Sequence, residues 1–391
     1  MQQTAPALET LLRDRICTEG PLQFDRFMET ALYHPALGYY RSGTPRVGRA
    51  GDFFTSVSTG PYFGKLLARQ VAEVWEALAR PDPFRIVEQG ADSGDLAADL
   101  LAAIERDHPE LDRASHLVLI EPFPELASRQ TQRLAAFREK VRHVERPELL
   151  PPLPSIHLSN ELLDAFPVRV VEKAASGNWH ELRVGHTGSA FAWEPSPDPA
   201  PIPPELAPWL APLPAGYRTE WREGIRPWME AVARTLTVGA MLLIDYGYPR
   251  DVYYESRRSS GSLSAYRNHQ RCDNPLATPG AIDLTAHVDF TAVAEAAEGV
   301  GLRVAGFTDQ GRYLLGLAQA DFARWESDPE TPAGIAERRS LQTLTHPGAL
   351  GADFHALLLT RGIEPGPRFA GFAARNDAAR LHPPVLSSIT P

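Results

Sequence analysis

The feature that most constrains the fold is an alternation of short apolar runs and helix-like segments between residues 84 and 160. Helical segments from 95 to about 105 and from 124 to about 137 follow the first two runs. Connections of this kind join parallel strands through helical crossovers. The sequence therefore predicts an α/β fold. Four runs are predicted to be its strands: FRIVEQ (84–89), HLVLIE (116–121), VRHV (141–144) and SIHLS (155–159).

The segments on either side of this alternation have different patterns. Residues from about 5 to 32 and from 61 to about 79 have helical periodicity. After residue 166, turn signals separate three β-like runs, which we interpret as a hairpin or meander inserted into the sheet domain. The proline-dense stretch from 195 to 214 is expected to be extended. The three β-like runs are VRVVEKA (168–174), HELRV (180–184) and SAFAWEP (189–195).

The remaining elements complete the predicted sheet. We expect a helix from 218 to about 236, a buried strand GAMLLIDYG (239–247) and a helix around 290–298. LRVAGFT (302–308) and RYLLGLA (312–318) are predicted to form an antiparallel pair, and FHALLLT (354–360) is strand-like. We expect three parts, listed by residues: an N-terminal helical segment (1–80), a sheet domain (81–320) with an inserted lobe around 167–235, and helices, a strand and a proline-rich tail (321–391).

Composition excludes several classes of function. The 391 residues are 43% hydrophobic and 23% charged, as in soluble globular proteins, and the net charge of -10 disfavours general nucleic-acid binding. Cys17 and Cys272 are the only cysteines, so we expect no disulfide framework, no Cys-rich zinc site and no metal. No apolar run approaches the roughly 20 residues that span a bilayer. No signal sequence is evident, so a cytoplasmic protein without membrane insertion is expected.

Polar residues follow four of the predicted strands. Gly90 and Gly94 follow the first strand, Glu121 the second, Asn160 and Glu161 the fourth, and Asp245 lies in the fifth. In a doubly wound sheet, ligands bind beyond the carboxyl ends of the strands. Each residue also has a structural interpretation, because glycines form tight turns and acids cap helices. Their joint occurrence favours a ligand site.

Asp92 stands where a cofactor-binding loop would usually have another glycine. The loop is therefore a cofactor site, an altered cofactor site or a tight turn. Aspartate tolerates left-handed backbone better than most residues. Its carboxylate would repel a pyrophosphate but could be neutral or favourable near a sulfonium or an ammonium group. This disfavours a dinucleotide-dependent oxidoreductase, which has the same arrangement of strand, loop and acid.

Longer motifs occur in the order seen in one family. The chain resembles the MidA-like S-adenosylmethionine-dependent methyltransferases, which include a mitochondrial complex I assembly factor that methylates arginine. The resemblance extends from about residue 8 to residue 362. The motifs are HPALGYY (34–40), GDFFTS (51–56), YFGKLLARQ (62–70), SNELLDAFPV (159–168), LLIDYG (242–247), AYRNHQ (265–270) and DLTAHVDFTAV (283–293).

The resemblance implies a fold, a cofactor and a binding site. The fold is a Rossmann-like seven-stranded methyltransferase sheet with an added helical/β lobe and an N-terminal helical extension. The cofactor is S-adenosyl-L-methionine, with Glu121 at its ribose. The cofactor-binding positions are Gly51, Asp52, Phe53 and Thr55 in a loop over the pocket, Gly90, Asp92 and Gly94 in the glycine loop, Glu121, and Asn160.

The resemblance also implies a protein substrate, with a respiratory complex I subunit as one candidate. Methyl transfer needs alignment of donor and acceptor more than acid–base power. Glu161 would neutralise an arginine guanidinium through a charge-assisted hydrogen bond, and Asn160 would orient it. His287 and Asp289 would complete the acceptor wall or accept the released proton. Alternatively, their motif braces the lobe against the sheet.

Two departures from the family pattern keep other functions open. Asp92 replaces a glycine, and Val57-Ser58 replaces a proline-glutamate pair. The first would alter cofactor affinity, and the second would alter acceptor recognition. A catalytically inactive assembly or binding factor is therefore the alternative to a protein arginine methyltransferase. A bacterial cytoplasm is expected as the compartment, with the mitochondrial matrix as the alternative. The sequence does not specify an oligomeric state.

Overall fold

The computed structural model describes residues 4–42, 55–267, 270–348, 350–364 and 369–382. Its largest sheet has eight strands: seven follow the order β15-β16-β10-β5-β2-β3-β4, and the short strand β14 pairs with the end of β10. This confirms the predicted seven-stranded α/β sheet. The strands are β2 (Phe84–Gln89), β3 (Ser115–Ile120), β4 (Val141–Val144), β5 (Leu153–Asn160), β10 (Leu236–Tyr248), β14 (Val288–Asp289), β15 (Arg303–Asp309) and β16 (Phe354–Arg361).

Five neighbouring strands of this sheet, β4, β3, β2, β5 and β10, are parallel, whereas β16 runs antiparallel to both β10 and β15. Alternate residues of β10 enter different cores. Leu242 and Ile244 belong to one apolar cluster, and Met241 and Leu243 belong to another. The sheet is therefore buried on both faces, which explains why its central strands are almost continuously apolar.

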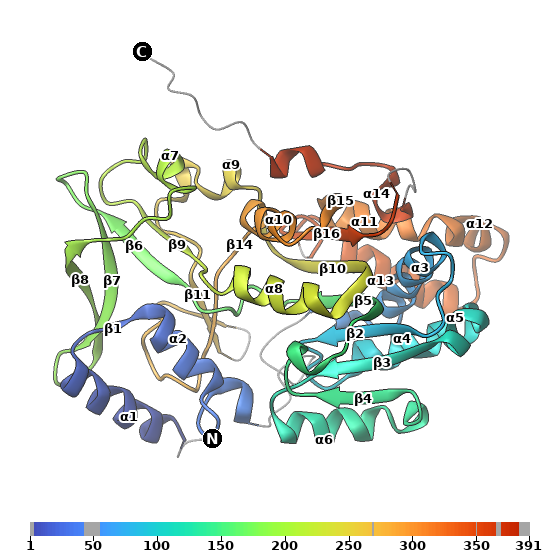
Figure 1. Ribbon diagram of the computed structural model, residues 1–391, viewed down its shortest axis with the longest axis horizontal. Helices are drawn as coiled ribbons and strands as arrows, with labels where there is room; N and C mark the ends of the chain where they lie inside the picture. Colours follow the sequence, from blue (N-terminus) through green and yellow to red (C-terminus); the bar gives the residue numbers. More distant parts are fainter. Residues whose placement is uncertain (1–3, 43–54, 268–269, 349, 365–368, 383–391) are drawn as a thin grey trace, which may run out of the picture.

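Helices cover both faces of the sheet (Figure 1). The cluster on one face includes residues of α3, α4, α11 and α13, and the cluster on the other includes residues of α8 and α10. The helices are α3 (Tyr62–Ala77), α4 (Asp95–Asp107), α5 (Pro109–Ala114), α6 (Pro124–Arg133), α8 (Ile225–Thr235), α9 (Arg250–Tyr253), α10 (Phe290–Gly299), α11 (Gln310–Leu317), α12 (Gln319–Ser327), α13 (Pro332–Thr345) and α14 (Ala370–Ala373).

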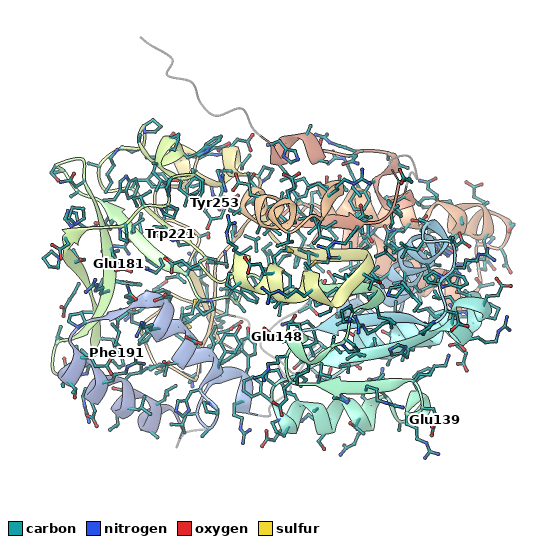
Figure 2. All side chains as sticks on the ribbon, in the orientation of Figure 1. Glu139, Glu148, Glu181, Phe191, Trp221 and Tyr253 are labelled. Atoms are coloured by element: carbon teal, nitrogen blue, oxygen red, sulfur yellow. The ribbon has the colours of Figure 1, made fainter. Side chains whose placement is uncertain are left out.

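A second sheet lies beside the first, at the left of Figure 1. Its order is β1-β7-β6-β9, with β8 on β7. Helix α2 packs on it, and Phe27 contacts Phe191 with ring centroids 5.5 Å apart (Figure 2). The elements are α1 (Thr4–Glu19), β1 (Leu22–Gln23), α2 (Phe24–Tyr33), β6 (Arg169–Lys173), β7 (Trp179–His186), β8 (Phe191–Pro199), α7 (Ala207–Leu210) and β9 (Arg218–Trp221).

A small third sheet joins the apolar core beneath α1 and α2. It has the order β12-β11-β13, with β11 (Ser264–Arg267), β12 (Gln270–Cys272) and β13 (Asp283–Thr285). Ala265 and Leu284, which pair across it, are buried in the same cluster as Phe27. Trp221 and Tyr253, labelled in Figure 2, belong to a separate cluster with α7. None of the helices in the described ranges is both long enough and apolar enough to cross a membrane.

Two predicted elements have the wrong secondary structure. RYLLGLA lies in helix α11, whose N-cap is Asp309, and β15 pairs instead with β16. Residues Arg218–Trp221 form strand β9 ahead of helix α8. In addition, the predicted helix over 5–32 is divided into α1 and α2 by the short strand β1. The three β-like runs after residue 166 are confirmed as β6, β7 and β8.

Candidate active site

A cavity of about 670 Å³ lies at the carboxyl ends of β2, β3, β5 and β10. These ends are aligned, because Gln89 of β2 pairs with both Ile120 of β3 and Ser159 of β5. The loops that follow the strands therefore begin side by side. The opposite wall comes from α2 and from β11 and β13 of the third sheet. The volume is within the range of small-molecule and cofactor sites.

The cavity wall is strongly acidic. Among its described residues, nine have carboxyl side chains and none is lysine or arginine. A wall of this kind attracts cations and repels anions. The nine residues are Glu29, Glu88, Asp92, Asp95, Glu121, Glu161, Asp164, Asp283 and Asp353.

Three residues of the loop after β2 have backbone dihedral angles in the left-handed region. Gly90, Asp92 and Gly94 have φ angles of 84°, 43° and 85°. Asp92 thus adopts backbone that favours glycine, as its sequence position indicated. Its carbonyl oxygen accepts a hydrogen bond from Nε2 of Gln130, at 2.9 Å. Gly90 and Asp92 line the cavity, whereas Gly94 precedes α4 and is not among the lining residues.

Glu121 is held at the end of β3 by two hydrogen bonds. Its carboxylate accepts from the backbone N–H of Phe123 at 2.9 Å and from Nε2 of Gln130 at 3.0 Å. Burial raises its pKa to about 7, although these bonds lower it. Gln130 therefore links the glycine loop to Glu121. The sequence analysis missed Gln130, because nothing distinguishes it from other polar residues of α6.

Glu88 is a second residue that the sequence analysis missed. It lies in β2, is only 3% exposed and lines the cavity. Its Oε2 has no hydrogen-bond partner among the described residues, and burial raises its pKa to about 8. A buried carboxyl group in this state fits a cationic or hydrogen-bond-donating ligand. The available signal was an acid inside an apolar strand directly before a glycine loop.

Asn160 and Glu161 lie together at the end of β5. Nδ2 of Asn160 donates to Oε1 of Glu161 at 3.0 Å, while Oδ1 of Asn160 is buried without a partner in the described chain. Glu161 has a φ of 55°, and its backbone N–H donates to the carbonyl of Ile244. Burial, followed by the charges of Asp164 and Asp245, raises the pKa of Glu161 well above its usual value.

Asp245 shapes the loop behind Glu161. Its Oδ2 accepts hydrogen bonds from the backbone N–H groups of Leu162, Leu163 and Asp164 at 3.1, 2.7 and 3.3 Å. Asp245 is not among the lining residues, whereas Asp164 is. Burial raises the pKa of Asp164 to about 6, against the opposing charge of Arg222. The polar strand end predicted at Asp245 is thus structural support for the acidic wall.

Thr55 and Val57 line the cavity from the segment before α3. Thr55 caps the 3-10 turn η2 (Ser56–Thr59), and its backbone N–H donates to Oγ of Ser58 at 3.2 Å. Ser58, which replaces the glutamate of the family pattern, is thus engaged in a capping box. Gly51, Asp52 and Phe53 lie outside the described residues.

The two polar residues of one motif, His287 and Asp289, have different roles. His287 lines the cavity, but Asp289 does not. Asp289 caps α10 by accepting from the backbone N–H groups of Thr291 and Ala292, and its Oδ2 accepts from Nε of Arg250 at 2.9 Å. These contacts favour the bracing interpretation for Asp289 over an acceptor wall. Within the described ranges no cluster of His, Cys, Asp or Glu is arranged to hold a metal ion.

The comparisons with known proteins agree with this arrangement. The family model described as "Putative S-adenosyl-L-methionine-dependent methyltransferase" matches residues 66–308, which is more than half of the chain. The chain belongs to this methyltransferase family. The methyltransferase is also 32% identical to a protein of Burkholderia thailandensis whose crystal structure holds S-adenosyl-homocysteine. The two structures have a TM-score of 0.85, with 95% of this chain and 96% of that chain covered.

Curated relatives of the methyltransferase have more specific names. A Drosophila melanogaster protein named protein arginine methyltransferase NDUFAF7 homolog, mitochondrial, is 27% identical over 91% of this chain and 85% of its own length. The mouse protein arginine methyltransferase NDUFAF7, mitochondrial, is 29% identical over 76% and 71%. The cofactor of the family is S-adenosyl-L-methionine. The acidic cavity fits this cationic molecule, since buried oxygens of Glu88 and Asn160 have no partner within the part of the chain that the structure describes.

Proposed function

We propose that this methyltransferase modifies an arginine side chain of a protein. The observation that carries the proposal is the carboxyl group of Glu161 after the end of β5, in a cavity whose described lining has no basic side chain. The charge of Arg222 acts on Asp164 from outside that lining, whereas the side-chain hydrogen bond to Glu161 among the described residues comes from neutral Asn160. An ionised carboxylate in a site of low dielectric constant needs a cationic partner. A guanidinium ion would supply the charge and the paired donors. The names of the curated relatives support the same acceptor.

The cofactor would be held by the loops after β2 and β3. Glu88 would accept a hydrogen bond from its ammonium group, and Glu121 would accept from the ribose hydroxyls. The left-handed loop at Gly90 and Asp92 would let the backbone pass close to the methionine part, and Thr55 would lie in the covering segment. Bound S-adenosylmethionine supplies an electrophilic methyl group on a sulfonium. The protein supplies alignment and charge complementarity.

Glu161 would neutralise the positive charge of the acceptor. Burial raises the pKa of Glu161 and so favours the protonated side chain in the free protein, whereas an entering guanidinium would favour the carboxylate. The carboxylate would then orient the guanidinium and accept the proton that the methylated nitrogen loses. Nδ2 of Asn160 fixes this carboxyl group, and its unpaired Oδ1 is available to an acceptor N–H.

A binding or assembly factor with little turnover is the second candidate. It is favoured by Asp92 at a glycine position and by Ser58 at an acidic one. The resemblance to a complex I assembly factor makes a respiratory complex I subunit a candidate acceptor in either case. The names of the curated relatives include the word mitochondrial and support a mitochondrial compartment, while the similarity to a Burkholderia protein is compatible with a bacterial source.

A two-stage experiment distinguishes the candidates. Calorimetry first measures binding of S-adenosylmethionine to the protein. Labelled cofactor is then incubated with candidate proteins, including complex I subunits, and with versions in which each methylated arginine is replaced by lysine. We expect transfer that mass spectrometry locates on arginine and that the lysine versions lose. Cofactor binding without transfer to any acceptor would support the binding factor, and transfer to lysine would contradict the proposal.

A further inference from the structure

The imidazole ring of His287 is fixed on several sides. Nη2 of Arg258 lies 2.8 Å from its Nδ1, and the Arg258 guanidinium stacks 4.6 Å above the ring of Tyr248, which in turn packs 5.4 Å from His287. The backbone N–H of His287 donates to Oγ of Ser262 at 2.8 Å, and its carbonyl accepts from Nη1 of Arg222 at 2.6 Å. Ring and backbone are therefore both held in place.

The contact with Arg258 determines which ring nitrogen carries the proton. A guanidinium can only donate, so Nδ1 of His287 must be the acceptor. The neutral ring then carries its proton on Nε2. No described residue is a partner of Nε2, and His287 lines the cavity. His287 thus offers an N–H donor to a wall that has nine carboxyl groups among its described residues.

The surroundings keep this ring neutral. Burial and then the positive charge of Arg258 lower the pKa of His287 to about 4, with Arg222 acting in the same direction and Asp353 opposing them. The hydroxyl of Tyr248 donates to the carboxylate of Asp353 at 2.8 Å and so fixes its position. A ring whose Nδ1 is occupied and whose Nε2 is protonated does not accept the proton released by methyl transfer. That role, expected as one alternative from the sequence, does not fit these contacts.

The position of His287 in the cavity indicates which part of a bound substrate its Nε2–H group would contact. The residue directly precedes β14, which pairs with the end of β10, whereas the proposed cofactor loops follow β2 and β3 on the other side of β5. The donor is thus on the proposed acceptor side of the cavity. A guanidinium group has only donors, so it cannot accept this hydrogen bond. The acceptors that accompany an arginine in a protein are its main-chain carbonyl oxygens.

We propose that His287 binds a main-chain carbonyl oxygen of the acceptor polypeptide, and that Arg258 is the positioning residue that presents its Nε2–H. This inference rests on the proposed arginine methyltransferase function and adds the residue that recognises the polypeptide around the arginine. The acceptor is an arginine within a polypeptide chain, and small guanidines lack the carbonyl that His287 binds.

The protonated nitrogen can be measured without an activity assay. Nitrogen-detected NMR of the histidine rings in the parent protein, with cofactor bound, reports which nitrogen carries the proton. We expect His287 to remain the neutral Nε2–H form between pH 5.5 and 8. Assignment uses His287→Gln, in which that signal disappears. A proton on Nδ1, or titration near the ordinary value of about 6.5, overturns the proposal.

The substrate class is tested with His287→Phe, which keeps a ring but removes the donor. We expect kcat/KM for a peptide or protein acceptor to fall about tenfold or more, as expected for one hydrogen bond. We expect the rate with methylguanidine and the affinity for S-adenosylmethionine to be the same as in the parent. The control is His346→Gln, which alters an exposed histidine. An equal loss for both acceptors, or a loss of cofactor affinity, overturns the proposal.

Arg258 is tested through the pH profile. Removing its charge in Arg258→Met raises the pKa of His287, while burial still keeps it below the ordinary value, so the KM for the peptide should acquire a pH dependence with a midpoint between about 4 and about 6.5. Arg257→Met is the matched control, because Arg257 is exposed and pairs with Glu255. Arg258→Lys, which keeps a donor, should restore the parent profile. An Arg258→Met profile identical to that of the control overturns the proposal. If the parent methylates no arginine, the proposed function fails as well, while the NMR result stands.

Discussion

Glu88, Glu121 and Glu161 lie at or beside the carboxyl ends of three neighbouring strands, and burial raises the pKa of each. Ionised carboxylates in such surroundings are costly unless protons or a cation neutralise them. A ligand with positive charge removes this cost when it binds. The burial that makes these ionised carboxylates costly therefore favours a cationic ligand, such as the sulfonium of S-adenosylmethionine.

Replacement of Glu161 tests the proposed acceptor role. Glu161→Gln keeps the size and the hydrogen bond to Asn160 but removes the negative charge. We expect methyl transfer to fall about 100-fold, as for the loss of one electrostatic catalytic group. Affinity for S-adenosylmethionine, measured by calorimetry, should not change. Glu148→Gln is the control, because Glu148, labelled in Figure 2, is exposed and is not among the residues that line the cavity. A parent rate in Glu161→Gln would remove Glu161 from the chemistry.

Asp92→Gly tests the altered loop. Asp92 has a φ of 43°, which glycine adopts without strain. We expect cofactor affinity to be preserved or increased in isothermal calorimetry. The backbone carbonyl that Gln130 binds is retained in the variant. A large loss of affinity would instead mean that the Asp92 carboxylate itself holds the cofactor, and that the loop is specialised.

At the scale of helices and strands, the sequence pattern predicts those elements that depend on interactions within short segments. The strands β2, β3, β4 and β5 and the helices between them were predictable, because apolar runs and crossover lengths are properties of short segments. RYLLGLA was misassigned, since Tyr313, Leu314 and Leu317 fit a strand or a buried helix equally well. The helix is formed because it packs against a segment that is distant in the sequence. At Gly316 this packing is so close that an added Cβ would lie 2.2 Å from the carbonyl oxygen of Ala370.

The same limit applies to the candidate site. Glu121 and Glu161 were found because they follow apolar runs, whereas Glu88 was hidden inside one. Asp289 was grouped with His287 because both belong to one motif, but one residue between them is enough to turn their side chains to different partners. Spacing alone does not show which of two neighbouring polar residues enters a cavity and which caps a helix.

Asp289→Ala tests the structural role of this residue. The change removes the N-cap of α10 and one partner of the buried Arg250, which keeps its bond to Glu295. We expect a decrease of about 1–3 kcal/mol in the free energy of unfolding, from the lost cap and charged hydrogen bond. The kcat of the folded variant should remain near that of the parent. Asp309→Ala, at the N-cap of α11, is the comparison, and a selective loss of kcat in Asp289→Ala would argue for a catalytic role.

At the scale of the molecule, the cavity lies where separate sheets meet, and contacts across it join them. The Tyr33 hydroxyl of α2 donates to the carbonyl of Ala165 at 3.0 Å, and the Tyr40 hydroxyl donates to Asp283 at 3.0 Å. Residues far apart in sequence therefore form one wall. No short-range pattern indicates such a wall, which is why the acidic lining emerged only from the fold.

The buried carboxyls predict how the stability of the whole protein depends on pH. Glu88 and Glu121 have folded-state pKa values of about 8 and 7, above the ordinary value of 4.5. The folded protein thus binds more protons than the unfolded chain between these values, so their contribution to stability falls as pH rises from about 4.5 to 8. Thermal unfolding of Glu88→Gln should show a weaker decline than the parent protein.

Bound S-adenosylmethionine should reverse this decline, because its positive charge favours the ionised carboxyls. At 100 times Kd the stabilisation is about 2.7 kcal/mol. At equal cofactor concentration, the increase in melting temperature should be larger at pH 8 than at pH 6. An equal increase at both values, or identical profiles for Glu88→Gln and parent, would contradict the assignment of these groups.

The place of β16 in the largest sheet has a consequence for biosynthesis. Because β16 lies between β10 and β15, the ribosome completes both neighbours before it makes the strand that joins them. From Tyr248 to Phe354 this takes about 5 to 20 s at ordinary rates of synthesis. During that time the nascent chain exposes the unpaired edge of β10, which has 13 residues and is largely buried in the folded protein, and other chains can add there. A chaperone that covers this edge would have its greatest effect on yield in this interval.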